Sequence, residues 1–470
     1  MKKIEVLCII GLLFSSGISV SAFSLTQTQI VKGSTDAYDM VIIAPEVFSE
    51  SLAPLIAHKN SHGVQTFLKT MEEIDSTFDG RDAAERVKYF IKDAVEQYNI
   101  SYVLLVGGRM GQRLRWFVPV RYASVNDGVL HKMYLSDLYF ADIYKEDGSF
   151  EDWDSNRNGV FAEWGLDAST PGDVLNLVPD VAVGRLPCRS TDEVTAIINK
   201  IIAYETESSG QSWFNKILLI GGDTNPGVGA PFPYEGEADC DWALTHLEGF
   251  NATKLYTSDG TLTGPEDFLQ AFNAGNGFVY YAGHGWQDKM GTFPPNGTEV
   301  TFFMDNEHVS SLANSGMYPV MVVGCCVTTS FDVGVLNFLR IFHNYKKFNS
   351  FFAFKYECIP ECISWNMVKQ PSSGCIAWLG SSSTTWGEVG DKNHDDIPDG
   401  VQTGCTPGLC QEFFRLYGEE DGRILGMLFR GAVTHVVEEF SAAEDQTQCK
   451  CVSEYMLIGD PSLMIGGYID

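Results

Sequence analysis

Short apolar runs alternate with stretches of helical periodicity through the first part of the chain. Three such runs are residues 38–45, 102–108 and 181–188. Between them, residues 82–98 place apolar side chains three and four positions apart, the repeat of an amphipathic helix. Buried strands that alternate with helices are typical of a parallel α/β sheet. We therefore expect an N-terminal α/β subdomain over residues 38–210.

The same alternation returns in the second part of the chain. Its apolar runs are residues 216–224, 277–285, 318–326 and 374–383. A chain of 470 residues is also too long for one small core. We expect two tandem doubly wound α/β units with mainly parallel sheets, the second one spanning residues 211–470.

The N-terminal residues have the pattern of a secretory signal peptide. Two lysines precede an apolar stretch at residues 6–13, and small residues before and at Ala22 supply a cleavage site. A transmembrane anchor is the alternative, but the apolar stretch is short and glycine and serine interrupt it. We expect residues 1–22 to be a signal peptide and residues 23–37 a linker. The mature chain is then secreted and has no membrane span.

Composition narrows the class of protein further. Apolar residues make up 44% of the chain and aromatic residues 12%, as in a folded globular protein. The net charge of −29 argues against nucleic acid as a partner, because a phosphate backbone needs a basic surface.

Twelve cysteines include Cys8, which leaves with a cleaved signal, so an odd number remains in an oxidising compartment. Several are expected to form disulfide bonds, although the connectivity cannot be deduced. The neighbouring cysteines of the C-terminal third are Cys358/Cys362, Cys405/Cys410 and Cys449/Cys451. One thiol is left over, either as a reactive cysteine or as a link between chains.

Two apolar runs of the second unit end in residues that can carry chemistry. His284 and Gly285 end one run, and Cys325 and Cys326 end the next. The carboxyl ends of parallel strands meet on one edge of a sheet, so we expect His284 close to the cysteine pair. A histidine can take the proton of a thiol. The backbone N–H groups of Gly285 and of the nucleophile can then form an oxyanion hole.

Each of these motifs has a structural alternative. A single histidine after a strand is often a surface or core residue, and adjacent cysteines can be buried or can form a vicinal disulfide. A dinucleotide-binding reading of Gly107 and Gly108 is disfavoured, because only Gly111 follows and the expected acidic residue is not evident. A tight turn at a strand end explains these glycines better.

The order and context of the motifs resemble the gingipain family of caspase-like cysteine peptidases. Its signature is an apolar strand with His-Gly, followed by an apolar strand with a small residue and Cys. The segments that carry the resemblance are "YAGHGWQDKMGT", "VVGCCVTTSF", "SSSTTWGE" and "GDPSLMI". The resemblance extends from Tyr38 to the C-terminus. It implies a caspase-like second unit and a cysteine endopeptidase that acts on proteins or peptides.

The resemblance also implies roles for the two strand-end motifs, with Cys326 as nucleophile and His284 as its acid/base partner. The family's nucleophile follows a small residue and precedes a short polar segment that ends in an aromatic residue. Cys326, followed by a segment that ends at Phe331, fits this pattern better than Cys325. Cys325 stands where the family has Gly or Ala, and this departure leaves open a vicinal disulfide that silences the enzyme until reduction.

Three further positions match residues of the family. Asp223 corresponds to a carboxylate that orients the imidazole; a turn residue that caps the next helix is the alternative. Asp239 resembles the acidic residue at the base of the primary pocket in arginine-specific members, where it pairs with Arg or Lys of the substrate. A surface carboxylate is the alternative for Asp239. Trp386 matches a tryptophan that walls this pocket.

Two acidic loops predict structural calcium. The first supplies Asp152, Asp154, Asn156, Asn158 and Glu163, and the second supplies Asp391, Asn393, Asp395 and Asp399. Oxygen ligands at alternate positions suit Ca²⁺. Arg157 stands where an EF-hand has Gly, so the first loop is not a true EF-hand, and the second resembles the loops of thrombospondin type-3 repeats. Solvated acidic turns without metal are the alternative.

Taken together, the sequence predicts a secreted, calcium-stabilised cysteine endopeptidase that uses a Cys–His dyad, with Arg or Lys before the scissile bond. A catalytically silent calcium-binding protein of the cell surface, or an interaction protein on the same fold, is the alternative. Covalent labelling of Cys326 by a substrate-like alkylating agent distinguishes the two.

Overall fold

The computed structural model describes residues 37–125, 133–164, 172–227, 234–335, 359–395 and 397–469. These residues belong to a single unit of the chain, Asp36–Asp470. The predicted signal peptide, residues 1–22, lies outside the described residues, as do Cys358 and all but the last residue of the predicted linker. Among the described residues, no helix has the length and apolar character needed to cross a membrane.

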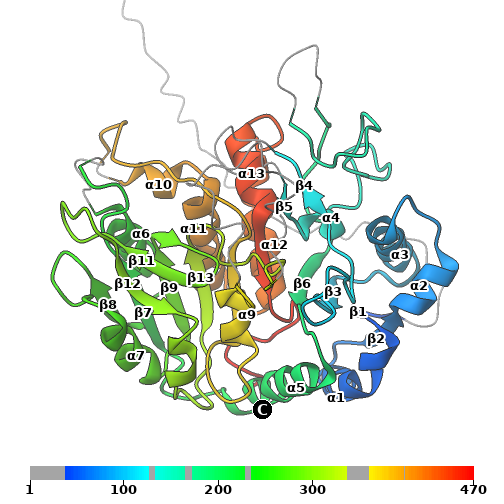
Figure 1. Cartoon of the computed structure of the whole chain (residues 1–470), viewed down its shortest axis with the longest axis horizontal. Coiled ribbons are helices and arrows are strands. Elements are labelled where there is room, and N and C mark those ends of the chain that lie inside the picture. Colours follow the sequence, from blue (N-terminus) through cyan, green and yellow to red (C-terminus); the bar gives the residue numbers. More distant parts are fainter. Residues whose placement is uncertain are drawn as a thin grey trace, which may run out of the picture. The chain divides into compact units, whose positions relative to one another are not determined.

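A ten-stranded sheet runs through the described chain (Figure 1). In spatial order its strands are β2 (Thr66–Thr70), β1 (Met40–Ala44), β3 (Tyr102–Val106), β6 (Ala182–Leu186), β15 (Tyr455–Ile458), β14 (Ala377–Ser381), β13 (Val320–Gly324), β9 (Phe278–Ala282), β7 (Lys216–Gly221) and β8 (Asn251–Tyr256). Eight of the nine neighbouring pairs are parallel, and β14–β15 is antiparallel. The predicted mainly parallel α/β architecture is confirmed.

The antiparallel pair divides the sheet into two halves that run in opposite directions. The strands β2, β1, β3, β6 and β15 share one direction, and β14, β13, β9, β7 and β8 share the other. The strands of residues 38–210 and of residues 211–470 therefore lie in one continuous sheet. The boundary between the two predicted units at residue 210 stays a prediction.

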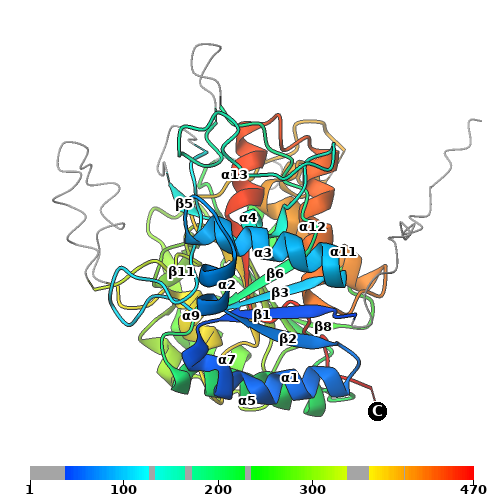
Figure 2. The same ribbon diagram turned by 90° about the vertical axis from the view of Figure 1, so that its right-hand side faces the viewer.

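Helices cover both faces of the first half. These helices are α1 (Ser49–Ser61), α2 (Met71–Thr77), α3 (Ala83–Tyr98), α4 (Leu138–Ala141) and α5 (Thr191–Glu207). Figure 2 shows α1 and α5 on one side of the strands and α3 on the other. The side chain of Asp82 accepts a hydrogen bond from the backbone of Glu85 and starts α3. The predicted helix over residues 82–98 is confirmed, and its apolar stripe is buried against the sheet.

The second half has its own set of helices. They are α6 (Glu235–Thr245), α7 (Pro265–Asn273), α9 (Ile363–Val368), α10 (Asp399–Gln402), α11 (Cys405–Gly418), α12 (Leu425–Glu439) and α13 (Gln446–Glu454). Helix α11 packs on α6, α12 and β13, while α6 packs on β7 and β9, and α12 packs on β6 of the first half. A separate three-stranded sheet is built from β10 (His284–Gly285), β11 (Lys289–Thr292) and β12 (Thr301–Asp305). A small hairpin-like sheet consists of β4 (Tyr122–Ala123) and β5 (Tyr134–Leu135).

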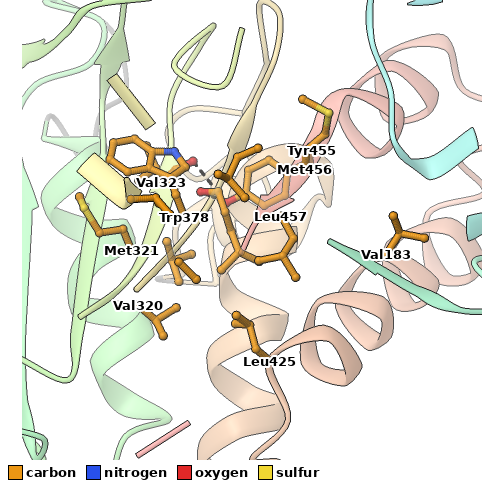
Figure 3. Close-up of a cluster of buried hydrophobic side chains, with 14 of the residues drawn as sticks. Val183, Val320, Met321, Val323, Trp378, Leu425, Tyr455, Met456 and Leu457 are labelled. Atoms are coloured by element: carbon orange, nitrogen blue, oxygen red, sulfur yellow. Dashed lines mark hydrogen bonds between the residues drawn. The ribbon is translucent and has the colours of Figure 1, made fainter. Parts of the chain in front are cut away.

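The two halves of the sheet meet at β15, the last strand of the chain. The hydroxyl of Tyr455 hydrogen bonds to the carbonyl oxygens of Val323 and Leu379, each at 3.3 Å, which ties β15 to β13 and β14. Figure 3 shows Tyr455 among the buried apolar side chains of these strands, with Trp378 and Leu457. This cluster is the centre of the core.

The closing "GDPSL" segment is held by a buried ion cluster. The ammonium of Lys59 in α1 lies 2.7 Å from Glu205 of α5 and 2.8 Å from Asp460. Ser462 donates to Asp460 from both its backbone N–H and its hydroxyl. The two carboxylates hold the pKa of Lys59 above its ordinary value against the effect of burial. The segment that resembles the gingipain family is therefore a structural clamp between the chain's end and its first helices.

Candidate active site

The carboxyl ends of β9 and β13 bring the predicted catalytic motifs together. The two strands are parallel neighbours, and Ala282 pairs with Gly324 at their ends. The backbone N–H of Gly283 donates to the carbonyl of Gly324 at 3.2 Å. His284 and Cys326 follow within two residues of this link. The rule that parallel strands end on one edge therefore places them correctly.

A pocket of about 210 Å³ opens at this edge of the sheet. Cys326 and His284 both line it, and so do Asp239 and Trp386. Four residues that the sequence singled out from separate segments thus share one cavity. The catalytic roles assigned to them stay predictions.

The loop after β13 holds the thiol of Cys326 in a strained turn. Val327 has φ of 47°, a left-handed conformation that is unfavourable for a β-branched residue. Such strain costs of order 1–3 kcal/mol and persists only where the surroundings enforce it. The backbone N–H of Val327 donates to Ser383 at 2.8 Å, and that of Thr329 donates to Ser381 at 3.0 Å. The end of β14 therefore fixes the turn that presents the thiol.

The two adjacent cysteines occupy different environments. Cys326 is partly exposed at the pocket, and the backbone N–H of Thr385 donates to its sulfur at 3.4 Å. Cys325 is buried, and its nearest hydrogen-bonding group is the hydroxyl of Thr328, 4.0 Å away. Both are free thiols. Only Cys326 faces the cavity that a substrate can enter.

His284 is fixed by a backbone carbonyl. Its Nε2 lies 2.7 Å from the carbonyl oxygen of Thr224. A carbonyl can only accept, so Nε2 carries a hydrogen and Nδ1 is the basic atom of the neutral ring. The ring of Phe293 packs edge-on against the imidazole, with centroids 5.5 Å apart.

The thiol and the imidazole are both neutral at neutral pH. Burial raises the pKa of Cys326 to about 11, although the Thr385 N–H and Lys450 act in the opposite direction. Burial also lowers the pKa of His284, against the contributions of Thr224 and Asp223 that raise it. Both pKa shifts therefore favour the neutral thiol and the neutral imidazole over a preformed ion pair.

Asp223, predicted to orient the imidazole, lies close to His284 without taking its hydrogen bond. Its backbone pairs with Phe293, and its side chain is 2% exposed. Burial raises the pKa of the carboxyl, while nearby backbone N–H groups and His284 lower it. Its Oδ1 is buried without a hydrogen-bond partner among the described residues. The orienting role stays a prediction, and the group that fixes the ring in the structure is the carbonyl of Thr224.

Glu235 is a pocket residue that the sequence analysis missed. It lies at the start of α6, and its carboxylate accepts hydrogen bonds from the backbone N–H of Thr224 at 3.1 Å and from its hydroxyl at 2.9 Å. Glu235 therefore positions Thr224, whose carbonyl oxygen accepts the hydrogen bond of His284. No sequence signal marks this chain of contacts, because its central link is a main-chain carbonyl.

Asp239 lies at the floor of the pocket, as the predicted substrate-binding role requires. An ideal Cβ on Gly400 would lie 3.3 Å from its carboxylate, so α10 closes over the acidic group. Burial and the charge of Glu235 raise the pKa of Asp239 to about 7. Within the described residues the carboxylate has no ion-pair partner. Trp386 is 38% exposed at the rim of the same pocket.

Gly285 packs directly against the loop of Cys325 and Cys326. A Cβ at this position would lie 2.3 Å from the carbonyl oxygen of Cys326 and 2.5 Å from the sulfur of Cys325. Real Cβ contacts are never this short, so only glycine fits between His284 and the cysteine pair. The backbone of Gly285 is thus adjacent to the Cys326 carbonyl and the Cys325 thiol, and its part in an oxyanion hole stays a prediction.

The first predicted calcium loop is already paired with a cation. The guanidinium of Arg81 lies 2.6 Å from Asp154 and 3.4 Å from Asp152. Further along the loop, Asn158 donates to Glu163 at 2.5 Å, so these side chains converge. Asp173, which the sequence analysis did not include, accepts hydrogen bonds from the backbone of Asn156 and Glu163.

In the second predicted calcium loop, side-chain oxygens accept hydrogen bonds from the loop's own backbone, and its calcium site stays a prediction. Asp391 and Asn393 both accept from the backbone N–H of Asp395, each at 3.2 Å, and Asp399 accepts from the backbone of Lys392 at 3.0 Å. The oxygens therefore point into the loop. In the described part of the chain, no group of three or more His, Cys, Asp or Glu side chains meets the geometry of a metal site. A calcium ion here would depend on Asn393 and backbone oxygens as well.

The described cysteines are all free thiols. They are Cys188, Cys240, Cys325, Cys326, Cys362, Cys375, Cys405, Cys410, Cys449 and Cys451. Cys410 hydrogen bonds to the hydroxyl of Tyr455 at 3.2 Å. Cys405 instead contacts Cys451, through a hydrogen bond between the two thiols. Cys405 therefore lies next to Cys451 in space, although Cys410 is its nearest cysteine in the sequence.

Comparisons with known proteins agree with this geometry. Gingipain R2 of Porphyromonas gingivalis (strain ATCC 33277) is 21% identical over 433 residues, which are 91% of this chain and 46% of that protein. Lys-gingipain W83 of the same organism is 26% identical over 219 residues, which are 45% of this chain and 10% of that protein. The chain therefore spans less than half the length of these curated relatives.

Solved structures share the fold. The crystal structure of the Arg-specific cysteine proteinase gingipain R (RgpB) matches with a TM-score of 0.62 at 17% identity, over 91% of this chain and 78% of that chain. The complex of P. gingivalis RgpB pro- and mature domains matches with a TM-score of 0.59 at 19% identity, over 91% and 79% of the two chains. The model of peptidase family C25 matches residues 34–466. The predicted resemblance is thereby confirmed, and the chain belongs to peptidase family C25.

Proposed function

We propose that this chain is a cysteine endopeptidase that hydrolyses peptide bonds of proteins through Cys326 and His284. One observation carries the proposal. A thiol and an imidazole from adjacent strand ends line a single pocket, and its floor is a buried carboxylate. Membership of a peptidase family supports the same reaction class.

The reaction begins with attack of the Cys326 sulfur on the substrate carbonyl. Because the pKa of the thiol is raised to about 11 and that of His284 is lowered, the imidazole accepts the proton as the bond forms. The imidazolium then protonates the leaving amine, and water hydrolyses the acyl-enzyme. The backbone N–H groups of Gly285 and Cys326 stabilise the oxyanion.

Asp223 and Thr224 divide the task of supporting the imidazole. The carbonyl of Thr224 fixes the tautomer that leaves Nδ1 free to act as the base. The carboxylate of Asp223 is close enough to raise the pKa of His284, so it stabilises the imidazolium formed during the reaction. The unsatisfied Oδ1 of Asp223 agrees with a group that is held ready for that charge.

The preferred residue before the scissile bond is arginine or lysine. Asp239 is buried at the pocket floor without an ion pair within the described residues, and a cationic side chain would satisfy it. Trp386 at the rim would pack against the aliphatic part of such a side chain. The names of the matched relatives point in the same direction, since one is described as Arg-specific and another as Lys-gingipain.

We also propose that the chain is exported from the cell and that calcium and a disulfide bond stabilise its fold. Export rests on the signal pattern of residues 1–22. Calcium would be held in the loop that contains Asp391 and Asp395, where it would order the segment between Trp386 and α10. In an oxidising compartment, the contact between Cys405 and Cys451 makes them the first candidates for a bond. Peptide mapping of the non-reduced exported protein tests that pairing.

Covalent labelling tests the proposed peptidase. An arginyl chloromethylketone should alkylate Cys326 in the native protein, and peptide mapping should place the adduct on that residue. The matched controls are Cys325→Ala, which should still be labelled, and His284→Ala, which should react far more slowly. A protein that is not labelled and does not cleave basic peptides would instead be a catalytically silent binding protein on the same fold.

A further inference from the structure

The three-stranded sheet β10–β11–β12 carries aromatic side chains next to His284. His284 pairs with Gly291 of β11, and Gly291 pairs with Phe302 of β12. Trp286 is two residues beyond His284, so both side chains are on the same face of the strand. The face that presents the imidazole therefore also presents Trp286 and Phe302.

The aromatic side chains form a continuous surface, which we call the aromatic shelf and define as Trp286 and Phe302. Their ring centroids are 5.0 Å apart at an angle of 64°. The centroid of His284 lies 6.5 Å from that of Trp286. Phe302 is 39% exposed, so part of its ring meets solvent. The shelf is therefore accessible from solvent beside the imidazole.

Gly291 shapes the shelf between His284 and Phe302. A Cβ on Gly291 would lie 2.9 Å from Cδ1 of Phe302, so the phenylalanine ring covers the space that a side chain would fill. This places the edge of Phe302 over the residue that pairs directly with His284. Val300 Cγ1, at 2.7 Å, and the carbonyl oxygen of Thr301, at 2.8 Å, fill the same space.

The shelf is distinct from the pocket that contains Asp239 and Trp386. Neither Trp286 nor Phe302 lines that pocket, and His284 is the residue that both surfaces share. The pocket is the proposed site for the residue before the scissile bond. His284 gives its proton to the departing amine, so the polypeptide beyond the scissile bond must leave past the imidazole. The shelf is an apolar surface beside that imidazole.

We propose that the aromatic shelf is a subsite for a large apolar side chain just after the scissile bond. This inference rests on the proposed peptidase function and adds a preference on the leaving-group side. Leucine or phenylalanine would lose apolar surface to water when it packs on Trp286 and Phe302. The ammonium of Lys289 lies 4.9 Å from the ring centroid of Phe302 and 6.0 Å from that of Trp286. A substrate lysine or arginine on the shelf would therefore meet a like charge.

Matched peptides measure this preference. Internally quenched peptides with Arg before the scissile bond and Leu, Gly or Lys after it should differ in kcat/KM. An apolar contact of this size is worth about tenfold, with Leu above Gly and Lys below both. In Trp286→Ala and Phe302→Ala, the ratio between Leu and Gly peptides should fall to near one. Phe302→Leu, which keeps an apolar surface, should retain part of it.

Two controls separate this inference from the proposed function. Met427→Ala removes an apolar side chain of similar exposure, 36%, at a distant helix and should leave the ratio unchanged. An arginyl chloromethylketone has no residue after the reacting carbonyl, so it should label Cys326 at equal rates in wild type, Trp286→Ala and Phe302→Ala. This equality also shows that the variants fold.

The outcomes are distinguishable. Normal labelling with no Leu preference in the wild type, or with a preference that survives both alanine variants, overturns the shelf while the peptidase stands. Loss of labelling in the wild type removes the peptidase and the shelf together. The acyl-enzyme can react with water or with an added amine, and the ratio of the two products gives an independent measurement. Leucine amide should capture a larger share of the acyl group than glycine amide.

Discussion

The two halves of the sheet use the same strand-end pattern for opposite purposes. At the carboxyl end of β3, Gly108 packs so tightly that a Cβ would lie 2.2 Å from the carbonyl oxygen of Pro187. The neighbouring strand β6 contributes Arg185, which is fully buried and bonds to both carboxylate oxygens of Asp137, at 2.6 and 2.7 Å. This edge is filled, and its charges are paired.

At the carboxyl ends of β9 and β13, the corresponding groups are left without such partners. His284 and Cys326 open onto a cavity, and the carboxylate of Asp239 at its floor has no ion pair among the described residues. The antiparallel junction of β14 and β15 also points the two edges in opposite directions. Strand ends alone therefore do not create a site. The second edge differs because it leaves a cavity and an acidic group without a cationic partner among the described residues.

The largest expected effect is at the carboxyl ends of β9 and β13, where the pocket lies. Cys326→Ala should lower kcat/KM for an arginyl peptide by about 10⁴-fold or more, because it removes the nucleophile. Cys325→Ala should remain close to wild type, because that sulfur is buried away from the pocket. Steady-state hydrolysis with circular dichroism as a folding control decides the point. If Cys325→Ala loses activity and Cys326→Ala keeps it, the assignment of the nucleophile is reversed.

Substitutions at the carboxyl ends of β3 and β6 should change the stability of the protein rather than its activity. Arg185→Met leaves Asp137 buried and uncompensated, which should lower the free energy of unfolding by about 3–5 kcal/mol. The activity per folded molecule should be unchanged. The double variant with Asp137→Leu should recover much of the loss. Urea unfolding measures the change, and a selective loss of kcat without destabilisation would show that the two edges are not independent.

Support of the imidazole is the next effect in size. Glu235→Ala frees the Thr224 segment that accepts the hydrogen bond of His284. We expect kcat to fall between about tenfold and 100-fold, because misplacement of a catalytic group by about 1 Å has that effect. Glu235→Gln still accepts from the Thr224 hydroxyl and should restore most of the rate. If both variants lower only KM or stability, Glu235 does not position the base.

The pH dependence should separate the two titrating groups of the pocket. The pKa of Asp239 is raised to about 7, so the carboxylate loses its charge as the pH falls below 7 and binds an arginyl side chain less well. The value of kcat/KM for an arginyl peptide should therefore rise about tenfold between pH 6 and pH 8. Asp239→Asn should remove this rise and leave only the limb of His284, which lies at lower pH because its pKa is lowered. An unchanged profile would exclude Asp239 as the substrate's partner.

The smallest expected effect belongs to calcium. If the loop of Asp391 and Asp395 binds Ca²⁺, a concentration of 100 times Kd stabilises the fold by about 2.7 kcal/mol. Chelation should then lower Tm by several degrees in the wild type and much less in Asp395→Asn. Asp152→Asn is the matched control at the loop that already pairs with Arg81. Equal responses of all three proteins would argue against a site in the second loop.

The elements and the pairing of His284 with Cys326 could be predicted because they depend on short-range patterns. The apolar runs gave β7, β9, β13 and β14 to within a few residues, and the parallel-sheet rule brought their ends together. The single sheet could not be predicted. It depends on β15, the final strand, which inserts between β6 and β14 and touches β6 through one register pair, Ile458 with Arg185.

The residues that support the site also could not be predicted from the sequence. The partner of His284 is the main-chain carbonyl of Thr224, and a carbonyl has no residue-type signature. Glu235 was one acidic residue among 61 Asp and Glu, so its contact with Thr224 was not separable from surface charge. The strained turn at Val327 contradicts local preference, since valine disfavours a positive φ.

The most direct test of the central claim is the mass of the acyl-enzyme. An arginyl ester substrate is mixed with excess enzyme, quenched in acid within milliseconds and digested for peptide mapping. We expect a transient acyl group on Cys326, absent in His284→Ala over the same interval and never found on Cys325. A protein that hydrolyses the substrate without any acylated cysteine, or with the acyl group on Cys325, would contradict this account.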